Sequence, residues 1–253
     1  MSTWVLLRGL IRESRHWGEF PELLRRELPE ADVITLDLPG NGSLSHMRSP
    51  ARIEQMAEHC RRALAEKGFK PPYNLLAQSM GGMVAMAWQA AYPREIGNAV
   101  LISTSVRPHS AFYRRLRPQS YPLLARMMLS SRDPRRAEAR ILRIISSRGE
   151  QQPQVLDAWA GYARERPVSR VNALRQLLAA ARFRDPGAAG RGPVLLLAGA
   201  RDHLVDPACS RALARAWNAE LAIHPDAGHD VPLDDGPWVA AQVRTWLERR
   251  LGA

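Results

Sequence analysis

The sequence predicts an α/β protein built around a mostly parallel sheet with helices on both faces. Strand-like and helix-forming segments alternate along most of the chain, and strands connected in this way pair in parallel. The 253 residues are enough for one large core, and an α/β domain of this size commonly folds as a single unit. The predicted strands lie near residues 3–9, 32–38, 73–78, 98–104, 193–199 and 220–224.

Proline and capping residues predict several helix boundaries. Ser49-Pro50 predicts the start of a helix that runs to about Lys67, because serine is a favourable N-cap and proline fits the first helical position. Tyr92-Pro93 predicts the end of the helix that follows the third strand.

The segment Tyr73-Asn-Leu-Leu-Ala-Gln-Ser-Met-Gly-Gly82 predicts a strand, a sharp turn and a helix. A serine at such a turn becomes a nucleophile when a base takes its proton and nearby donors stabilise the oxyanion. Ser79 has small residues, Ala77 and Gly81, two positions away on either side, and the helix beginning at Met80 directs free N–H groups toward it. Ala77 replaces the first glycine of the G-x-S-x-G pattern, and by itself the string also fits an ordinary strand-to-helix turn.

Candidate partners for Ser79 follow it in the order Asp, His. Asp202 comes soon after the strand 193–199, and His229 follows the strand 220–224. The carboxyl ends of parallel strands are where open α/β sheets build their sites. The three residues are therefore expected to meet at one edge of the sheet.

Each candidate also has a simpler interpretation. Asp202 fits a turn carboxylate, and His229 fits a surface-loop histidine. Asp206 is a reserve acid, although it is better explained as an N-cap before Pro207. The remaining histidines have no comparable setting, and no pair of them has a convincing metal-ligand spacing. They are His16, His46, His59, His109, His203 and His224.

Taken together, the motifs resemble the α/β-hydrolase fold superfamily over most of the chain, and in particular its small serine esterases such as the pimeloyl-carrier-protein methyl ester esterases. The resemblance implies a catalytic triad of Ser79, Asp202 and His229, with Trp17 at a spacing often seen after the first motif. The motifs are Trp4-Val-Leu-Leu-Arg-Gly-Leu10, Asp37-Leu-Pro-Gly-Asn-Gly42, Gln78-Ser-Met-Gly-Gly82, Gly199-Ala-Arg-Asp-His-Leu-Val-Asp-Pro207 and Ala227-Gly-His229.

The same resemblance implies an oxyanion hole made by the backbone N–H groups of Leu10 and Met80. The sequence departs from the family here, because Arg8-Gly9 stands where His-Gly is usual. A guanidinium is permanently charged. The arginine therefore changes how the loop is held and which charge faces the substrate, unless the Arg8 side chain points to solvent.

Between residues 107 and 191 the strand pattern stops and apolar residues recur at helical spacing. We expect helices over 119–130, from Asp133-Pro134, over 151–166 and over 169–182. This segment is the expected helical cap, inserted after the sixth family strand. The domains are then a core of residues 1–106 and 192–253 and a cap of residues 107–191.

The cap carries apolar stripes that must be buried, mostly as packing and in part as the lining of an acyl pocket. The candidate pocket residues are Arg8, Trp17, Met127 and Trp159. The stripes comprise Met127, Met128, Ile141, Ile144, Ile145, Trp159, Leu174 and Leu178.

Positive charge is concentrated in the cap. Residues 107–191 hold 18 arginines and six acidic residues, a net charge of +12, whereas the whole chain carries +11. Such a field would attract an acidic partner, and an acyl carrier protein or a coenzyme A-linked substrate would suit it. The alternative is that the arginines are simply solvated. Stacking aromatics and binding motifs for nucleic acid are missing from the sequence.

Composition narrows the setting further. A membrane-spanning run of apolar residues and a signal peptide are both missing, so we expect a cytoplasmic protein without a membrane partner. Cys60 and Cys209 fall in predicted helices and are expected to be reduced, buried thiols. The proposed chemistry requires no cofactor or metal.

The predicted function is therefore that of a serine hydrolase acting on carboxylic esters of small to medium acyl groups, in a narrower form on a carrier-linked substrate. The same triad also serves thioester or lactone hydrolysis, acyl transfer and carbon–carbon bond hydrolysis. Haloalkane dehalogenases and epoxide hydrolases are disfavoured, since they need an aspartate where Ser79 stands. An alternative from another class is a non-catalytic protein that binds a ligand or a carrier.

Overall fold

The computed structural model describes residues 2–122, 133–149, 152–187 and 192–252. Its centre is a six-stranded, all-parallel sheet in the order β2-β1-β3-β4-β5-β6. Each strand lies where an apolar run predicted it, with bounds shifted by at most two residues, so the predicted fold class is confirmed. The strands are β1 Ser2–Leu7, β2 Ala31–Leu36, β3 Tyr73–Gln78, β4 Ile96–Ile102, β5 Val194–Gly199 and β6 Glu220–His224.

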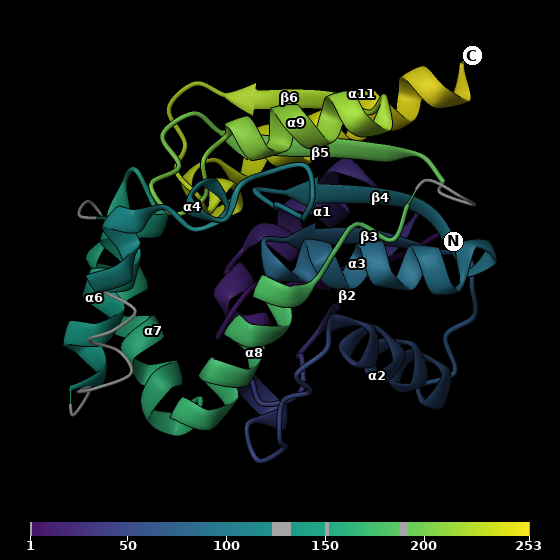
Figure 1. Cartoon of the computed structure of the whole chain (residues 1–253). Coiled ribbons are helices and arrows are strands. Elements are labelled where there is room, and N and C mark those ends of the chain that lie inside the picture. Colours follow the sequence, from purple (N-terminus) through teal and green to yellow (C-terminus); the bar gives the residue numbers. More distant parts are fainter. Residues whose placement is uncertain (1, 123–132, 150–151, 188–191, 253) are drawn as a thin grey trace.

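Two hydrophobic clusters cover the two faces of the sheet. Alternate residues of β1 point to opposite faces, with Val5 in one cluster and Leu6 in the other. On the first face the sheet packs against α2 (Ile53–Glu66), α3 (Met80–Ala91) and α9 (Ala208–Trp217). On the second face it packs against α1 (Phe20–Glu27) and α11 (Gly236–Leu251), as Figure 1 shows.

One predicted helix start is wrong. The helix expected from Ser49-Pro50 begins at Ile53 instead. Ser49 is fully buried and uses its groups for tertiary contacts, because its hydroxyl donates to the carbonyl of Pro39 and its N–H donates to Asn172. The predicted end of the helix that follows the third strand is confirmed, since α3 ends at Ala91, just before Tyr92-Pro93.

The described parts of the segment between β4 and β5 are mainly helical. Asp133 caps α6, as the sequence predicts, by accepting hydrogen bonds from the N–H groups of Arg135 and Arg136. Figure 1 shows α6 and α7 beyond the end of the sheet to which the β6 arrowhead points. The described helices here are α4 Phe112–Arg115, α6 Pro134–Ile145, α7 Pro153–Glu165 and α8 Arg170–Arg182.

The apolar residues of this segment do not all lie where the sequence predicts. Leu174 and Leu178 were expected to be buried, but they are 49% and 37% exposed, because they lie on the outer side of α8. Most of the expected helix 119–130, with Met127 and Met128, lies outside the described residues. Among the described helices, none has the length and apolar character needed to cross a membrane.

Candidate active site

Ser79 occupies a strained turn between β3 and α3. Its backbone angles are φ 55° and ψ −119°. This conformation is energetically unfavourable for any residue other than glycine, and such strained residues recur at functional sites. Two hydrogen bonds hold it: the Ser79 N–H donates to the Ile102 carbonyl at 2.8 Å, and the Thr104 hydroxyl donates to the Ser79 carbonyl at 2.8 Å. The turn therefore presents the Ser79 side chain at the carboxyl end of the sheet.

Small residues let the chain pack closely around this turn. A Cβ on Gly81 would lie 2.5 Å from the Leu7 carbonyl oxygen, and a Cβ on Gly9 would lie 3.0 Å from the Ser79 Cβ. The loop of residues 8–13, here called the β1 loop, thus lies directly against Ser79. The expected need for a small residue at position 81 follows from this contact with β1.

His229 and Asp202 form a buried hydrogen-bonded pair. The distance from His229 Nδ1 to Asp202 Oδ2 is 2.7 Å, and the two residues are 4% and 2% exposed. The other carboxylate oxygen of Asp202 accepts the N–H groups of Leu204 and Val205, both at 2.8 Å. These bonds fix the carboxylate, which in turn fixes the orientation of the imidazole ring.

The reserve acid has a different role. Asp206 accepts the N–H of Ala208, the first residue of α9, at 2.8 Å, but the N-cap of α9 is Pro207, whereas the sequence predicts Asp206. Its nearest cation is Arg114 at 3.9 Å. The structure therefore brings Asp202, and not Asp206, to His229.

Ser79 and His229 line the same cavity but make no hydrogen bond to each other in this structure. Bonds of this kind often shorten only when a substrate is bound. Leu10 and Met80 line the same cavity, and neither of their N–H groups has a hydrogen-bond acceptor among the residues that the structure describes. Unpaired donors beside a nucleophile can stabilise an oxyanion.

The cavity above Ser79 measures about 830 Å³ and is mainly apolar. Arg8 and Leu10 line it, as do three residues of α6, Ile141, Ile144 and Ile145. Other candidate pocket residues lie elsewhere or outside the described chain. Trp17 packs beneath the cavity against Phe20, Trp159 packs in a separate cluster within α6 and α7, and Met127 lies outside the described residues.

Arg8 is buried rather than directed to solvent. It is 2% exposed, and its guanidinium donates to both carboxylate oxygens of Asp230 and to Gln78 Oε1. The guanidinium also lies over the ring of Trp17, 4.7 Å from the ring centroid. Sequence reasoning missed Asp230 and Gln78. The available signal was that each is the chain neighbour of a proposed catalytic residue and that Arg8 needs a partner.

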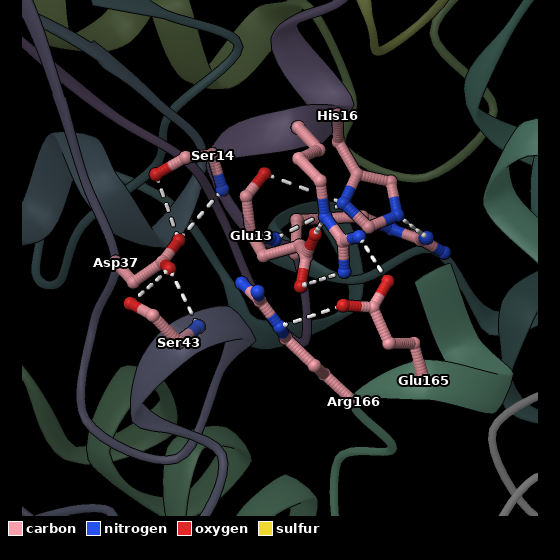
Figure 2. A network of polar contacts seen from close by, with 9 residues as sticks. Glu13, Ser14, His16, Asp37, Ser43, Glu165 and Arg166 are labelled. Carbon is pink, nitrogen blue, oxygen red and sulfur yellow. Dashed lines mark hydrogen bonds and ion pairs between the residues drawn. The ribbon is translucent and has the colours of Figure 1, made fainter. Parts of the chain in front are cut away.

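The β1 loop is fixed by the core and by the cap helices. Asp37 accepts the N–H and hydroxyl of Ser14 and those of Ser43, at 2.7–2.8 Å. Figure 2 shows the junction between the β1 loop and the helices that follow β4, with Asp37 and these serines on one side and Glu165 and Arg166 on the other. Within the β1 loop itself, the Ile11 N–H donates to Gln176 of α8 at 2.9 Å.

His16 lies buried within this junction. Arg12 bonds to its Nε2 at 2.8 Å and to Glu138 of α6 at 2.7 Å, and it lies over the Trp159 ring. Burial, followed by the charges of Arg12 and Arg8, holds the pKa of His16 well below its ordinary value of 6.5. His16 is therefore neutral near pH 7, and it serves as packing between the loop and α7.

Three arginines line one end of the cavity: Arg107, Arg115 and Arg184. Arg107 and Arg184 pair through their backbones, and neither has an acidic partner within the described residues. Arg115 donates to the Ala180 carbonyl at the end of α8, at 2.6 Å, and burial together with the charge of Arg107 lowers its pKa. Within the described part of the chain, these three guanidinium groups thus form no ion pair.

Comparisons with known proteins agree with the architecture. A family model described as alpha/beta hydrolase fold matches residues 5–236. The biotin biosynthesis bifunctional protein BioHC of Teredinibacter turnerae is 30% identical over 105 residues, which are 41% of this chain and 17% of that protein. The matches to curated relatives span about a fifth of those relatives' own length.

Solved structures match nearly the whole chain. A thermophilic esterase from Thermogutta terrifontis is 25% identical with a TM-score of 0.78, and the match covers 98% of this chain and 90% of that one. The esterase RhEst1 from Rhodococcus sp. ECU1013 is 22% identical with a TM-score of 0.75 at the same coverage of both chains. The family and the Thermogutta enzyme support hydrolytic activity in general, and the Rhodococcus structure supports the fold.

Proposed function

The chain belongs to the α/β-hydrolase fold family, and from this premise we propose that it is a serine hydrolase that cleaves carboxylic esters of small to medium acyl groups. One observation carries the proposal. Ser79 stands at a strained strand-to-helix turn and opens on the same cavity as His229, whose other ring nitrogen is held by buried Asp202. A hydroxyl, a base and an orienting acid in this arrangement support acyl transfer.

In the proposed mechanism, His229 takes the proton as Ser79 attacks the ester carbonyl. Asp202 holds the imidazole tautomer and stabilises its cation. The N–H groups of Leu10 and Met80 bind the oxyanion, each contributing about 3 kcal/mol of transition-state stabilisation. The alcohol leaves with the proton from His229, and water activated by the same histidine then releases the acid and restores the serine.

The cavity supports the acyl specificity. Its apolar walls, which include Ile141 and Ile145, suit a hydrocarbon chain, and its volume of about 830 Å³ falls within the range of small-molecule sites. A chain-length series of esters and thioesters, assayed free and carrier-bound, would identify the preferred acyl group and leaving group.

The first test removes the nucleophile. Ser79→Ala should reduce the hydrolysis of p-nitrophenyl esters by at least about 10⁴-fold, as loss of a triad serine does elsewhere, while the circular dichroism spectrum and Tm stay close to those of the native protein. A fluorophosphonate probe should label the native protein and leave the variant unlabelled. Undiminished hydrolysis by a folded Ser79→Ala variant would refute the proposal.

The narrower form is that the physiological ester is linked to an acidic carrier. It is supported by the three arginines at one end of the cavity, which have no ion-pair partner among the described residues and would attract an acidic partner. Changing Arg107 and Arg184 to glutamate should lower kcat/KM for a carrier-linked ester about 10-fold at low salt and flatten its salt dependence. The variant's rate on a neutral p-nitrophenyl ester reports any damage to the site itself. Unchanged rate and salt dependence on the carrier-linked ester would exclude this form.

A further inference from the structure

Arg8 and Asp230 belong to a closed ring of contacts around the proposed reacting groups. Arg8 donates to both oxygens of Asp230 and, at 2.5 Å, to Gln78 Oε1. Gln78 completes the ring by donating from Nε2 to the backbone carbonyl of His229 at 3.2 Å. Three separate segments are joined in this way: the β1 loop, the end of β3 and the loop after β6.

Each member of the ring is a chain neighbour of the proposed site. Gln78 precedes Ser79, Asp230 follows His229, and Arg8 precedes Gly9, which packs against the Ser79 Cβ. A displacement of Gln78 or Asp230 is therefore passed to Ser79 or His229 through a single peptide unit, and a displacement of Arg8 is passed on through the contact of Gly9 with Ser79. The Asp230 N–H also donates to the Ile145 carbonyl at 2.6 Å, which secures the loop after β6 against α6.

Stability alone does not account for a charged pair at this place. The side chains of Arg8 and Asp230 are 3% and 0% exposed. Removing two charges from water is costly, and replacing such a pair by apolar residues of similar volume is often neutral or stabilising. What an apolar pair lacks is direction, whereas a guanidinium forms a planar fork whose hydrogen bonds fix the angles as well as the distances.

We propose that Arg8 and Asp230 are positioning residues that hold the β1 loop, Ser79 and His229 in register for the reaction, and that Arg8 performs this through Asp230 and Gln78 rather than by binding substrate. The inference rests on the proposed function. It explains why a cation beside the oxyanion donors does not need to face the substrate: its charge is already matched by Asp230.

Two single variants separate alignment from charge. Arg8→Lys keeps the charge but loses the fork, because a single ammonium cannot form the two parallel bonds by which the two terminal guanidinium nitrogens hold the two Asp230 oxygens. Asp230→Asn removes the charged acceptor. Because a misplacement of about 1 Å in an active site can cost about 100-fold, each variant should lower kcat and the rate of fluorophosphonate labelling by about 10- to 100-fold. KM should change by less than about threefold, because substrate binding does not use these groups.

A double variant separates alignment from stability. Arg8→Met with Asp230→Leu leaves no unpaired charge, so its Tm should recover toward or above the native value. Its kcat should stay as low as in the single variants. The matched control is Leu64→Ala, which removes a fully buried side chain of α2 remote from the cavity; it should lower Tm while keeping the native kcat at temperatures below unfolding.

The outcomes distinguish this inference from the function on which it rests. If the native protein is neither labelled at Ser79 nor able to hydrolyse esters, the proposed function fails. If the native protein is active and the double variant regains kcat together with Tm, the pair only supports folding and the positioning role is wrong. A large rise in KM with unchanged kcat would instead assign Arg8 to substrate binding and overturn the inference as well.

Discussion

At the scale of single residues, the structure separates two aspartates that the sequence places four positions apart. Asp202 is 2% exposed and bonds to His229, whereas Asp206 accepts the N–H of Ala208 in the turn that leads into α9. The difference arises from the turn after β5, where the N–H groups of Leu204 and Val205 hold one Asp202 oxygen and leave the other for the imidazole.

This contrast makes a quantitative prediction. Asp202→Asn should lower kcat about 10⁴-fold, because an amide at this position favours the wrong imidazole tautomer. Asp206→Asn should leave kcat nearly unchanged and cost less than about 1 kcal/mol of stability, since the amide oxygen of asparagine can also accept the Ala208 N–H. Steady-state kinetics with a p-nitrophenyl ester and urea unfolding of both variants would measure these effects. Equal losses of kcat in the two variants would contradict the assignment of Asp202.

At the scale of elements, the junction between the β1 loop and the cap helices has a pH dependence that follows from His16. Its pKa is held below the ordinary value of 6.5 in the folded protein, mainly by burial. The unfolded chain therefore binds a proton that the folded chain does not. The free energy of unfolding should be independent of this group above pH 6.5 and should fall as the pH drops below it.

The contribution of His16 can be isolated by substitution. A fully coupled proton changes the free energy of unfolding by about 1.4 kcal/mol per pH unit, so His16→Gln should flatten the acid limb of the stability curve by up to that slope. Exposed His46 provides the control, and His46→Gln should keep the native slope. Urea unfolding at a series of pH values measures both slopes. An acid limb in His16→Gln as steep as in the native protein would show that other groups cause it.

The order of the elements could be predicted because each strand is recognisable from its own short stretch of sequence. Apolar runs of strand length, separated by helical periodicity, predicted the six strands of the described sheet, and Tyr92-Pro93 predicted the end of α3. The start of α2 could not be predicted in this way. Ser49 is a good cap by type, but tertiary contacts with Pro39 and Asn172 use its groups, and those partners are distant in the chain.

At the scale of the whole molecule, the candidate site depends on contacts between distant segments. The positions of Ser79, Asp202 and His229 at strand ends could be predicted, because the ends of parallel strands meet at one edge. The pairing of Arg8 with Asp230 spans 222 residues, and no local pattern encodes it. Tertiary packing also places two of the candidate pocket residues away from the cavity. Trp17 lies under Arg8 in the core, and Trp159 packs against His16.

The central claim is that Ser79 is a nucleophile activated by His229 and Asp202. The most direct measurement is the mass of the intact protein after reaction with a fluorophosphonate probe, followed by mapping of the modified peptide. The account predicts one adduct, on Ser79, that is lost in Ser79→Ala and forms far more slowly in Asp202→Asn. A folded native protein that acquires no adduct, or an adduct that persists in Ser79→Ala, would contradict it.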